Sequence, residues 1–122
     1  MIVDNGVSNT KVVQVSDSSW EKEVIEASKT MPVFVDCWAD WCTPCKMFQP
    51  IVEKVANEMS DKIKFASLDV DNNPATSQKY MIMAIPTLMV FMNGEKVFQQ
   101  SGLLPENSLK EMLNDHLSRM NK

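Results

Sequence analysis

The chain has 122 residues, a length that predicts a single domain. Its content of 44% apolar and 23% charged residues is typical of an ordinary soluble globular protein. The net charge of −4 includes a single arginine, Arg119, and this argues against a nucleic-acid partner because phosphate and base recognition depends on arginine. No apolar run approaches the ~20 residues that a membrane span needs, so we expect no membrane partner.

The chain begins with a short polar segment, and we expect an N-terminal arm over residues 1–10 and one domain over residues 11–122. The arm has neither the basic flank nor the apolar stretch of a secretory signal, so we expect a cytoplasmic protein. Residues 11–15 (KVVQV) favour a short strand. Ser18 and Glu21 then have the spacing of a capping box, which predicts the start of a helix.

Pro32 ends this first helix, because proline disfavours helical geometry in the residue before it. The apolar run 33–39 (VFVDCWA) is typical of a central strand that is covered on both faces. A long amphipathic helix follows, with Pro50 inside it and with an apolar stripe made of Phe48, Ile51, Val52, Val55 and Met59. Residues 63–70 predict another strand, and 72–74 (NNP) predict a turn.

The last third of the chain predicts a short helix, a hairpin and a final helix. The short helix covers residues 75–80, and Asn93-Gly94 joins strands 87–92 and 96–101 into a hairpin. Apolar residues at helical spacing from Leu109 to Met120 mark the final helix. The order β-α-β-α-β-α-β-β-α predicts an α/β fold, with helices on both faces of a mixed sheet.

Cys42 and Cys45 form a C-x-x-C motif between the buried strand and the long helix. In this context the motif predicts redox chemistry. The free N–H groups of a helix start stabilise a thiolate, so Cys42 is the expected nucleophile. Cys45 lies one helical turn further on and is the expected resolving thiol. Pro44 suits the first helical turn, where its missing N–H leaves no bond unmade.

Two alternatives for the cysteines are weaker. Three cysteines are too few for a disulfide scaffold, and their odd number argues against purely structural pairing. A zinc site needs four ligands, and the further candidates are Cys37, within a strand, and His116, near the far end of the chain. We therefore expect no metal site.

Asp36 is a carboxyl group within an apolar strand, six residues before Cys42. Burial raises the pKa of such a group, which makes it a usable proton acceptor near neutral pH. A purely structural aspartate is the alternative, and the nearby dithiol favours the catalytic interpretation. Strand alternation turns Cys37 to the opposite face of the sheet, where we expect it to pack as a small apolar residue.

Residues 35–46 (VDCWADWCTPCK) resemble the active-site segment of the thioredoxin family, and Ile85-Pro86-Thr87, Asn93-Gly94-Glu95 and Gly102 extend the resemblance over about residues 11–120. The resemblance implies the thioredoxin fold, a central five-stranded mixed β-sheet flanked by four α-helices. It also implies a thiol-disulfide oxidoreductase that reduces protein disulfides.

The same resemblance implies further features of the site. Pro86 would be a cis-proline opposite the dithiol, and Ile85 would offer backbone hydrogen bonds to an extended substrate. The groove would be bordered by Trp41, Ile85, Pro86, Gly94 and Gly102, although turn geometry alone is an alternative for Gly94. The Cys42-Cys45 disulfide would work without a bound cofactor, and the protein would be a monomer. Thioredoxin reductase would reduce the disulfide back to the dithiol.

The chain departs from the family pattern in several places. Thr43 stands where the family usually has glycine, and with Pro44 and Lys46 it is expected to tune the redox poise. Ser67 stands where the family often has a lysine beside the buried aspartate, so the pKa of Asp36 should be higher than in relatives with that lysine. Met81 and Met83 precede Pro86 and could broaden the choice of partner, although general methionine bias is the simpler explanation.

Two other functions remain open at this point. An oxidase, an isomerase or a cytochrome-maturation reductase would use the same motif, and its reduction potential would distinguish it from a general reductase. A binding or chaperone module would use the groove without redox turnover, and its activity would survive replacement of both Cys42 and Cys45 by serine.

Overall fold

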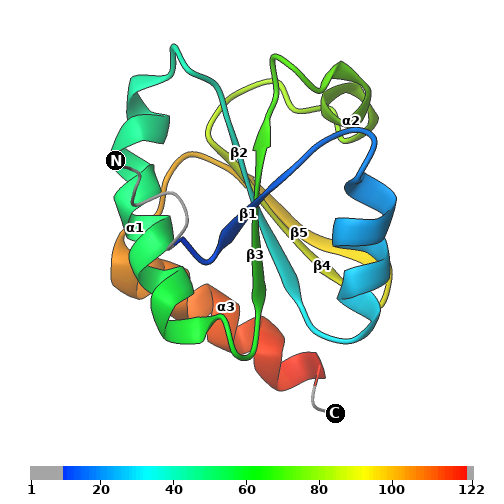
Figure 1. Ribbon diagram of the computed structural model, residues 1–122. Coiled ribbons are helices and arrows are strands. Elements are labelled where there is room, and N and C mark those ends of the chain that lie inside the picture. Colours follow the sequence, from blue (N-terminus) through cyan, green and yellow to red (C-terminus); the bar gives the residue numbers. More distant parts are fainter. Residues whose placement is uncertain (1–9, 121–122) are drawn as a thin grey trace.

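The computed structural model describes residues 10–120, so the N-terminal arm, apart from Thr10, lies outside the described residues. Five strands and four helical segments alternate along this part of the chain (Figure 1). In chain order they are β1 (Val12–Val15), a first helical segment made of η2 (Glu21–Glu26) and η3 (Ala27–Lys29), β2 (Val33–Trp38), α1 (Thr43–Met59), β3 (Lys64–Asp69), α2 (Pro74–Lys79), β4 (Thr87–Met92), β5 (Glu95–Ser101) and α3 (Glu106–Met120). The expected order of elements is confirmed.

The strands form one mixed sheet in the order β1-β3-β2-β4-β5. β1 and β2 both pair with β3 in parallel, whereas β4 runs antiparallel to β2 and to β5. β2 is therefore a central strand, as its apolar run predicts, and its residues from Val33 to Cys37 are buried. The register places Asp36 between Ser67 of β3 and Leu88 of β4.

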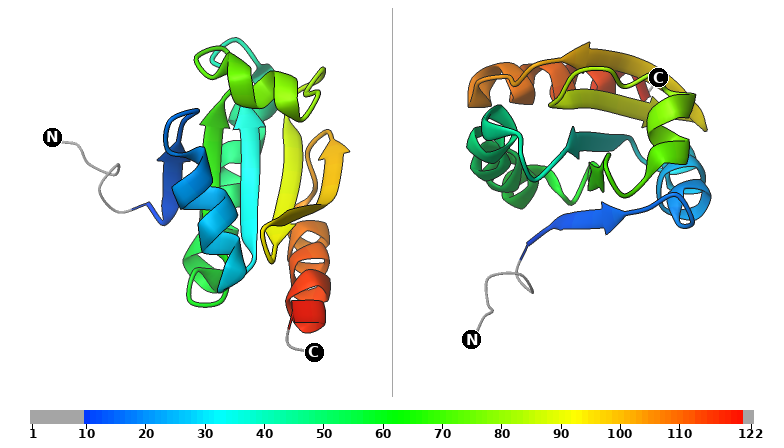
Figure 2. Two further views of the ribbon diagram at one scale, coloured as in Figure 1. Left: turned by 90° about the vertical axis from the view of Figure 1, so that its right-hand side faces the viewer. Right: turned by 90° about the horizontal axis from the view of Figure 1, so that it is seen from above.

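Helices cover both faces of the sheet, and each face has its own apolar core (Figure 2). The core on one face contains Phe34 of β2 together with side chains of α1 and α3. The core on the other face contains Val33 and Cys37 of β2 together with Val24 of η2. Because neighbouring residues of a strand point to opposite faces, Asp36 lies on the face that α1 covers and Cys37 on the face that η2 covers.

The start of the first helical segment differs from the expected capping box. Oγ of Ser18 lies 3.1 Å from Oγ of Ser16, and the backbone N–H of Ser16 donates to Oγ of Ser19 at 2.9 Å. Both hydroxyls therefore bond within the turn after β1 and not to the helix, whose N-cap residue is Trp20, without a capping side-chain hydrogen bond. The segment is also less regular than an α-helix: η2 is a turn of π-helix and η3 a turn of 3₁₀-helix.

The adjacent Asp17 caps a different helix. Its carboxylate accepts hydrogen bonds from the backbone N–H groups of Ala75 at 3.2 Å and Thr76 at 2.9 Å, and from the Thr76 hydroxyl at 2.6 Å. These are the free donors in the first turn of α2. None of the described helices is long and apolar enough to cross a membrane.

Candidate functional site

Cys42 and Cys45 are joined in a disulfide at the amino end of α1, with their Cα atoms 5.3 Å apart. Cys42 is the N-cap residue of the helix, and its Sγ accepts a hydrogen bond from the backbone N–H of Cys45 at 3.1 Å. The carbonyl of Cys42 accepts the first helical hydrogen bond, from the N–H of Lys46 at 3.2 Å. Sγ of Cys42 thus occupies the position in which a helix end stabilises negative charge.

Exposure does not distinguish the two sulfur-bearing residues. Cys42 is 3% exposed and Cys45 is 4% exposed in this oxidised form, whereas Thr43, Pro44 and Lys46 around them are exposed. The hydrogen bond to the Cys42 sulfur distinguishes them, because the same N–H donor would stabilise a thiolate on that residue once the disulfide opens. Pro44 lies in the first turn of α1, as expected.

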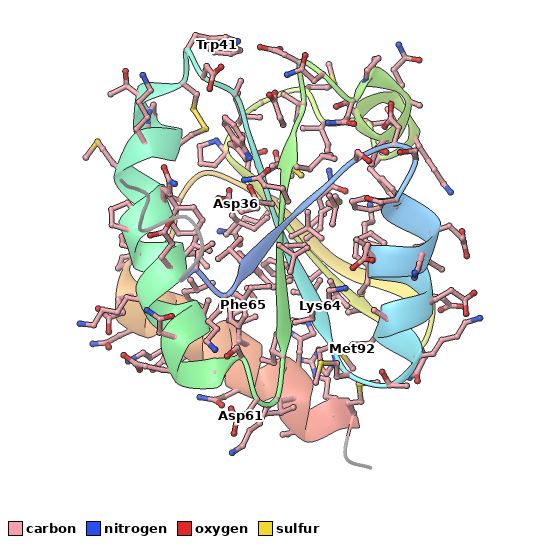
Figure 3. All side chains as sticks on the ribbon, viewed as in Figure 1. Asp36, Trp41, Asp61, Lys64, Phe65 and Met92 are labelled. Carbon is pink, nitrogen blue, oxygen red and sulfur yellow. A yellow bond between two sulfur atoms is a disulfide. The ribbon has the colours of Figure 1, made fainter. Side chains whose placement is uncertain are left out.

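Asp36 is a buried carboxyl group close to the dithiol end of the sheet (Figure 3). It is 5% exposed, and burial raises its pKa to about 7. Its Oδ1 has no hydrogen-bond partner among the residues that the structure describes. Ser67 lies opposite it on β3, as the family resemblance implies, so the paired position on that strand holds a hydroxyl in place of a cation. Asp36 and Cys45 line the same cavity.

Cys37 lies on the opposite face of the sheet and is fully buried in the core beneath η2. Burial, and to a smaller extent the charge of Asp36, raises the pKa of the Cys37 thiol far above its usual value. A thiol in this environment is neither accessible nor ionised at neutral pH. The expectation that Cys37 packs as a small apolar residue is confirmed.

The loop before β4 contains a cis peptide bond between Ile85 and Pro86, as the family resemblance implies. Thr87 pairs with Cys37, so this loop lies at the carboxyl end of β2, from which the chain leads to Cys42. The backbone N–H of Gly102 donates to the carbonyl of Pro86 at 2.8 Å. Within residues 10–120, no hydrogen bond joins the backbone of the half-buried Ile85 to another residue.

Two methionines of the same loop are exposed. Met83 is 90% exposed and Met81 is 73% exposed. Met81 also has a positive φ of 54°, a conformation that side chains with a Cβ adopt at some cost.

Trp41 borders the disulfide and is 68% exposed at the edge of the molecule (Figure 3). Its indole Nε1 donates a hydrogen bond to Oδ2 of Asp71 at 2.9 Å. Asp71 was not among the residues that the sequence singled out. The sequence did contain one signal for this contact. The parallel strands β2 and β3 end at the same edge of the sheet, so the residues that follow the two strands, here Trp41 and Asp71, lie close together.

Gly94 does not lie in a groove with the other expected border residues. It belongs to the turn between β4 and β5, and its N–H donates to Oγ of Ser28 at 2.9 Å. Because β4 runs antiparallel to β2, this turn is at the end of the sheet away from the disulfide. In Figure 3, Met92, which precedes the turn, and Trp41, which precedes Cys42, lie at opposite ends of the molecule. The expectation for Gly94 was wrong: its φ of 84° serves the turn.

The two residues considered as zinc ligands lie in different cores. Cys37 belongs to the core beneath η2, whereas His116 packs against Phe98 with ring centroids 5.5 Å apart and with Nδ1 2.9 Å from the carbonyl of Met112. Over residues 10–120, no group of three or more His, Cys, Asp or Glu side chains is placed to hold a metal ion.

Comparison with known proteins agrees with this geometry. The thioredoxin family profile matches residues 11–115. A thioredoxin from Rickettsia prowazekii is 45% identical over 103 residues, which cover 84% of this chain and 96% of that protein. Thioredoxin 1 of Synechococcus elongatus is 41% identical over 103 residues, covering 84% of this chain and 94% of that protein. A chloroplastic M-type thioredoxin of Brassica napus is 44% identical over 108 residues, covering 88% and 60% of the two chains. With the Cys42-Cys45 pair at a helix start, these matches show that the chain belongs to the thioredoxin family of thiol-disulfide oxidoreductases.

Proposed function

We propose that the chain reduces disulfides in protein substrates, with Cys42 as the attacking residue. The observation that carries this assignment is the hydrogen bond from the Cys45 backbone N–H to Sγ of Cys42 at the helix start. A charge on this sulfur is stabilised by that donor and by the partial positive charge of the helix end, both of which lower the pKa of a thiol.

The exchange proceeds in two steps. The Cys42 thiolate attacks one sulfur of the substrate disulfide, and the other substrate sulfur leaves as a thiolate and takes a proton from water. Cys45 then loses its proton and attacks Sγ of Cys42, which releases the second substrate sulfur as a thiolate. Two electrons have passed to the substrate, and the Cys42-Cys45 disulfide remains.

We assign to Asp36 the removal of the Cys45 proton in the second step. Three features support this role: the carboxyl group lines the same cavity as Cys45, it is buried, and its pKa of about 7 suits a proton acceptor near neutral pH.

We also propose that Trp41, Ile85, Pro86 and Gly102 border the substrate groove. No hydrogen bond within residues 10–120 occupies the backbone of Ile85, which supports pairing with an extended substrate segment by strand addition. A Cβ added at Gly102 would meet no atom within 4 Å, which is consistent with open space beside Pro86. Thr43, Pro44 and Lys46 surround the sulfur atoms, and we propose that they tune the reduction potential.

The remaining assignments follow from the family. We propose that thioredoxin reductase, with electrons from NADPH, regenerates the dithiol, and that the chain needs no bound cofactor. We further propose that it works as a monomeric electron carrier in the cytoplasm. A reducing compartment keeps such cysteines catalytic and not structural.

The test is the reduction of a model protein disulfide with NADPH and thioredoxin reductase. We expect Cys42→Ser to abolish turnover and Cys45→Ser to accumulate a mixed disulfide with the substrate. Cys37→Ala is the matched control, because it removes a thiol outside the proposed machinery, and it should retain turnover. Full activity of Cys42→Ser would refute the assignment, and a strongly oxidising reduction potential would favour an oxidase.

A further inference from the structure

The loop between α2 and β4 is apolar although much of it faces solvent (Figure 1). Residues 81–86 (MIMAIP) contain no charged side chain and no strong hydrogen-bonding side chain. Met81, Met83 and Ala84 are nevertheless exposed, and Met83 is the most exposed of the three methionines at the surface. An exposed apolar stretch of this kind marks a surface that contacts another molecule.

Hydrogen bonds hold both ends of this loop in place. At its start, the backbone N–H of Ile82 donates to the carbonyl of Ser77 at 2.9 Å, and the Ile82 side chain packs against the core beneath η2. At its end, the carbonyl of Pro86 accepts from the N–H of Gly102 at 2.8 Å. The positive φ of Met81 is therefore maintained by the surrounding structure, and strained backbone of this kind is concentrated at binding sites.

The methionines lie beside the proposed substrate groove. β4 begins at Thr87, opposite the carboxyl end of β2, so the loop shares one end of the sheet with the segment that leads to Cys42. Ile85, which is proposed to pair with the substrate backbone, follows Met83 by two positions. Trp41, at the same end, is another exposed apolar side chain. Because the methionines continue this groove, their partner is the polypeptide segment that flanks the disulfide of the substrate.

We propose that Met83, together with Met81, contacts apolar side chains next to the substrate disulfide, and that oxidation of these methionines by a peroxide weakens the contact. The contact rests on the reductase function proposed above. Methionine suits it because an unbranched, polarizable side chain adapts to partners of different shape. A sulfoxide oxygen would be buried there without a hydrogen-bond partner, which costs free energy.

Oxidation of a methionine needs only the peroxide. The sulfur of Met83 takes one oxygen atom of hydrogen peroxide: the O–O bond breaks, an S–O bond forms, and the second oxygen leaves as water. The thioether loses two electrons and the peroxide gains them. The cysteines do not compete in the oxidised protein, because Cys42 and Cys45 share a disulfide and Cys37 is fully buried. Within residues 10–120, the exposed methionines are therefore the sulfur atoms that peroxide reaches first.

The first measurement locates the sulfoxides. The oxidised protein is treated with hydrogen peroxide, and the modified residues are identified by mass spectrometry of its peptides. We expect Met83 and Met81 to react before Met89 and Met92, which are buried. Oxidation of the buried pair ahead of the loop would contradict the proposal.

The second measurement compares two synthetic peptide disulfides that differ only beside the cysteines, where one has leucine and the other serine. Each rate of reduction by the protein is divided by the rate with dithiothreitol, which corrects for the reactivity of the peptide itself. We expect the untreated protein to prefer the leucine peptide about fivefold, which corresponds to about 40 Å² of apolar surface removed from water. Protein treated with peroxide in its oxidised form, and then reduced, should lose most of this preference. Hydroxyethyl disulfide tests the dithiol alone and should react equally with treated and untreated protein.

Three variants test which residues are responsible. Met83→Gln makes the side chain polar and should lose most of the preference without peroxide. Met81→Leu/Met83→Leu keeps two apolar side chains that peroxide does not oxidise, so its preference should survive the treatment. Met47→Gln is the matched control, because Met47 is exposed on α1 two residues after Cys45. Two residues correspond to roughly 200° around the helix, so Met47 faces away from the buried sulfur, and this variant should behave as the parent does.

Failure of the contact and failure of the reductase function give different results. If the parent reduces neither peptide nor hydroxyethyl disulfide, both proposals are refuted. If it reduces all three with a preference that Met83→Gln and peroxide leave unchanged, only the methionine contact is refuted. A preference that peroxide abolishes equally in Met81→Leu/Met83→Leu would place the sensitive group elsewhere and would also refute the contact.

Discussion

Replacing Asp36 by asparagine should stabilise the protein, and by an amount that depends on pH. Burial raises the pKa of Asp36 from its ordinary value of 3.8 to about 7, so the folded state holds a proton that the unfolded state releases between these pH values. The contribution of Asp36 to the free energy of unfolding is therefore present at low pH and is lost as the pH rises toward the pKa of Asp36 in the folded state. At pH 8 a shift of about three units corresponds to about 4 kcal/mol, whereas at pH 5 only about 1.5 kcal/mol has been lost.

The measurement is urea unfolding of the oxidised parent and of Asp36→Asn at pH 5 and pH 8. We expect the stability difference between the two proteins to be about 2–3 kcal/mol larger at pH 8 than at pH 5. Groups whose pKa is lowered, such as Glu106, titrate in both proteins and cancel in the difference. Glu111→Gln, which removes an exposed carboxyl group on α3, is the matched control for the loss of one charge. A difference of equal size at both pH values would refute the reasoning, because the carboxyl would then not change its pKa on folding.

Three further predictions concern the backbone and a cap. Met81→Gly should stabilise the protein by about 0.5–1 kcal/mol in urea unfolding, because it relieves the positive φ of an exposed side chain; a loss of stability would contradict this. Gly102→Ala should destabilise it by about 1 kcal/mol, although the added Cβ meets open space, because φ there is 93°; unchanged stability would show that the backbone adapts. The Thr76 hydroxyl lowers the pKa of Asp17, so Asp17 stabilises the fold above its unfolded pKa, and this stability is lost as pH falls through the lower folded pKa. Asp17→Ala should therefore lower the thermal midpoint at pH 7 and have less effect at pH 2, and an equal effect at both would argue against the cap.

The sequence predicts the elements best where the signal is local. The Asn93-Gly94 hairpin, the strand before Cys42 and the helix start at the C-x-x-C motif each depend on a few adjacent residues, and all three are present. The capping box at Ser18 and Glu21 was wrong because the serines after β1 have other partners in the turn: the Ser18 hydroxyl lies beside the Ser16 hydroxyl, and the Ser19 hydroxyl accepts from the backbone N–H of Ser16. The role given to Gly94 was wrong because strand direction, and not local sequence, decides which end of the sheet a turn occupies.

Features of the site that depend on pairing across the chain were harder to predict. The position of Ser67 opposite Asp36 followed from the family resemblance, since two parallel strands far apart in sequence fix no register by themselves. The hydrogen bond between Trp41 and Asp71 joins residues that are 30 positions apart, and no motif connects them. The sequence could not predict that Nε1 of Trp38 has no partner among the described residues, because this depends on the position of every neighbouring side chain.

The environment of Asp36 favours a chemical role over a structural one. An aspartate with a structural role accepts hydrogen bonds that stabilise its charge, and such bonds lower its pKa. Asp36 shows the opposite: its pKa is raised, and its Oδ1 has no partner within residues 10–120. At neutral pH its carboxylate weakens the fold, so packing alone gives no reason for a carboxyl group at this position of β2. A proton acceptor for Cys45 does give one, because the burial that destabilises the charge also brings the pKa close to the pH at which a thiol must lose its proton.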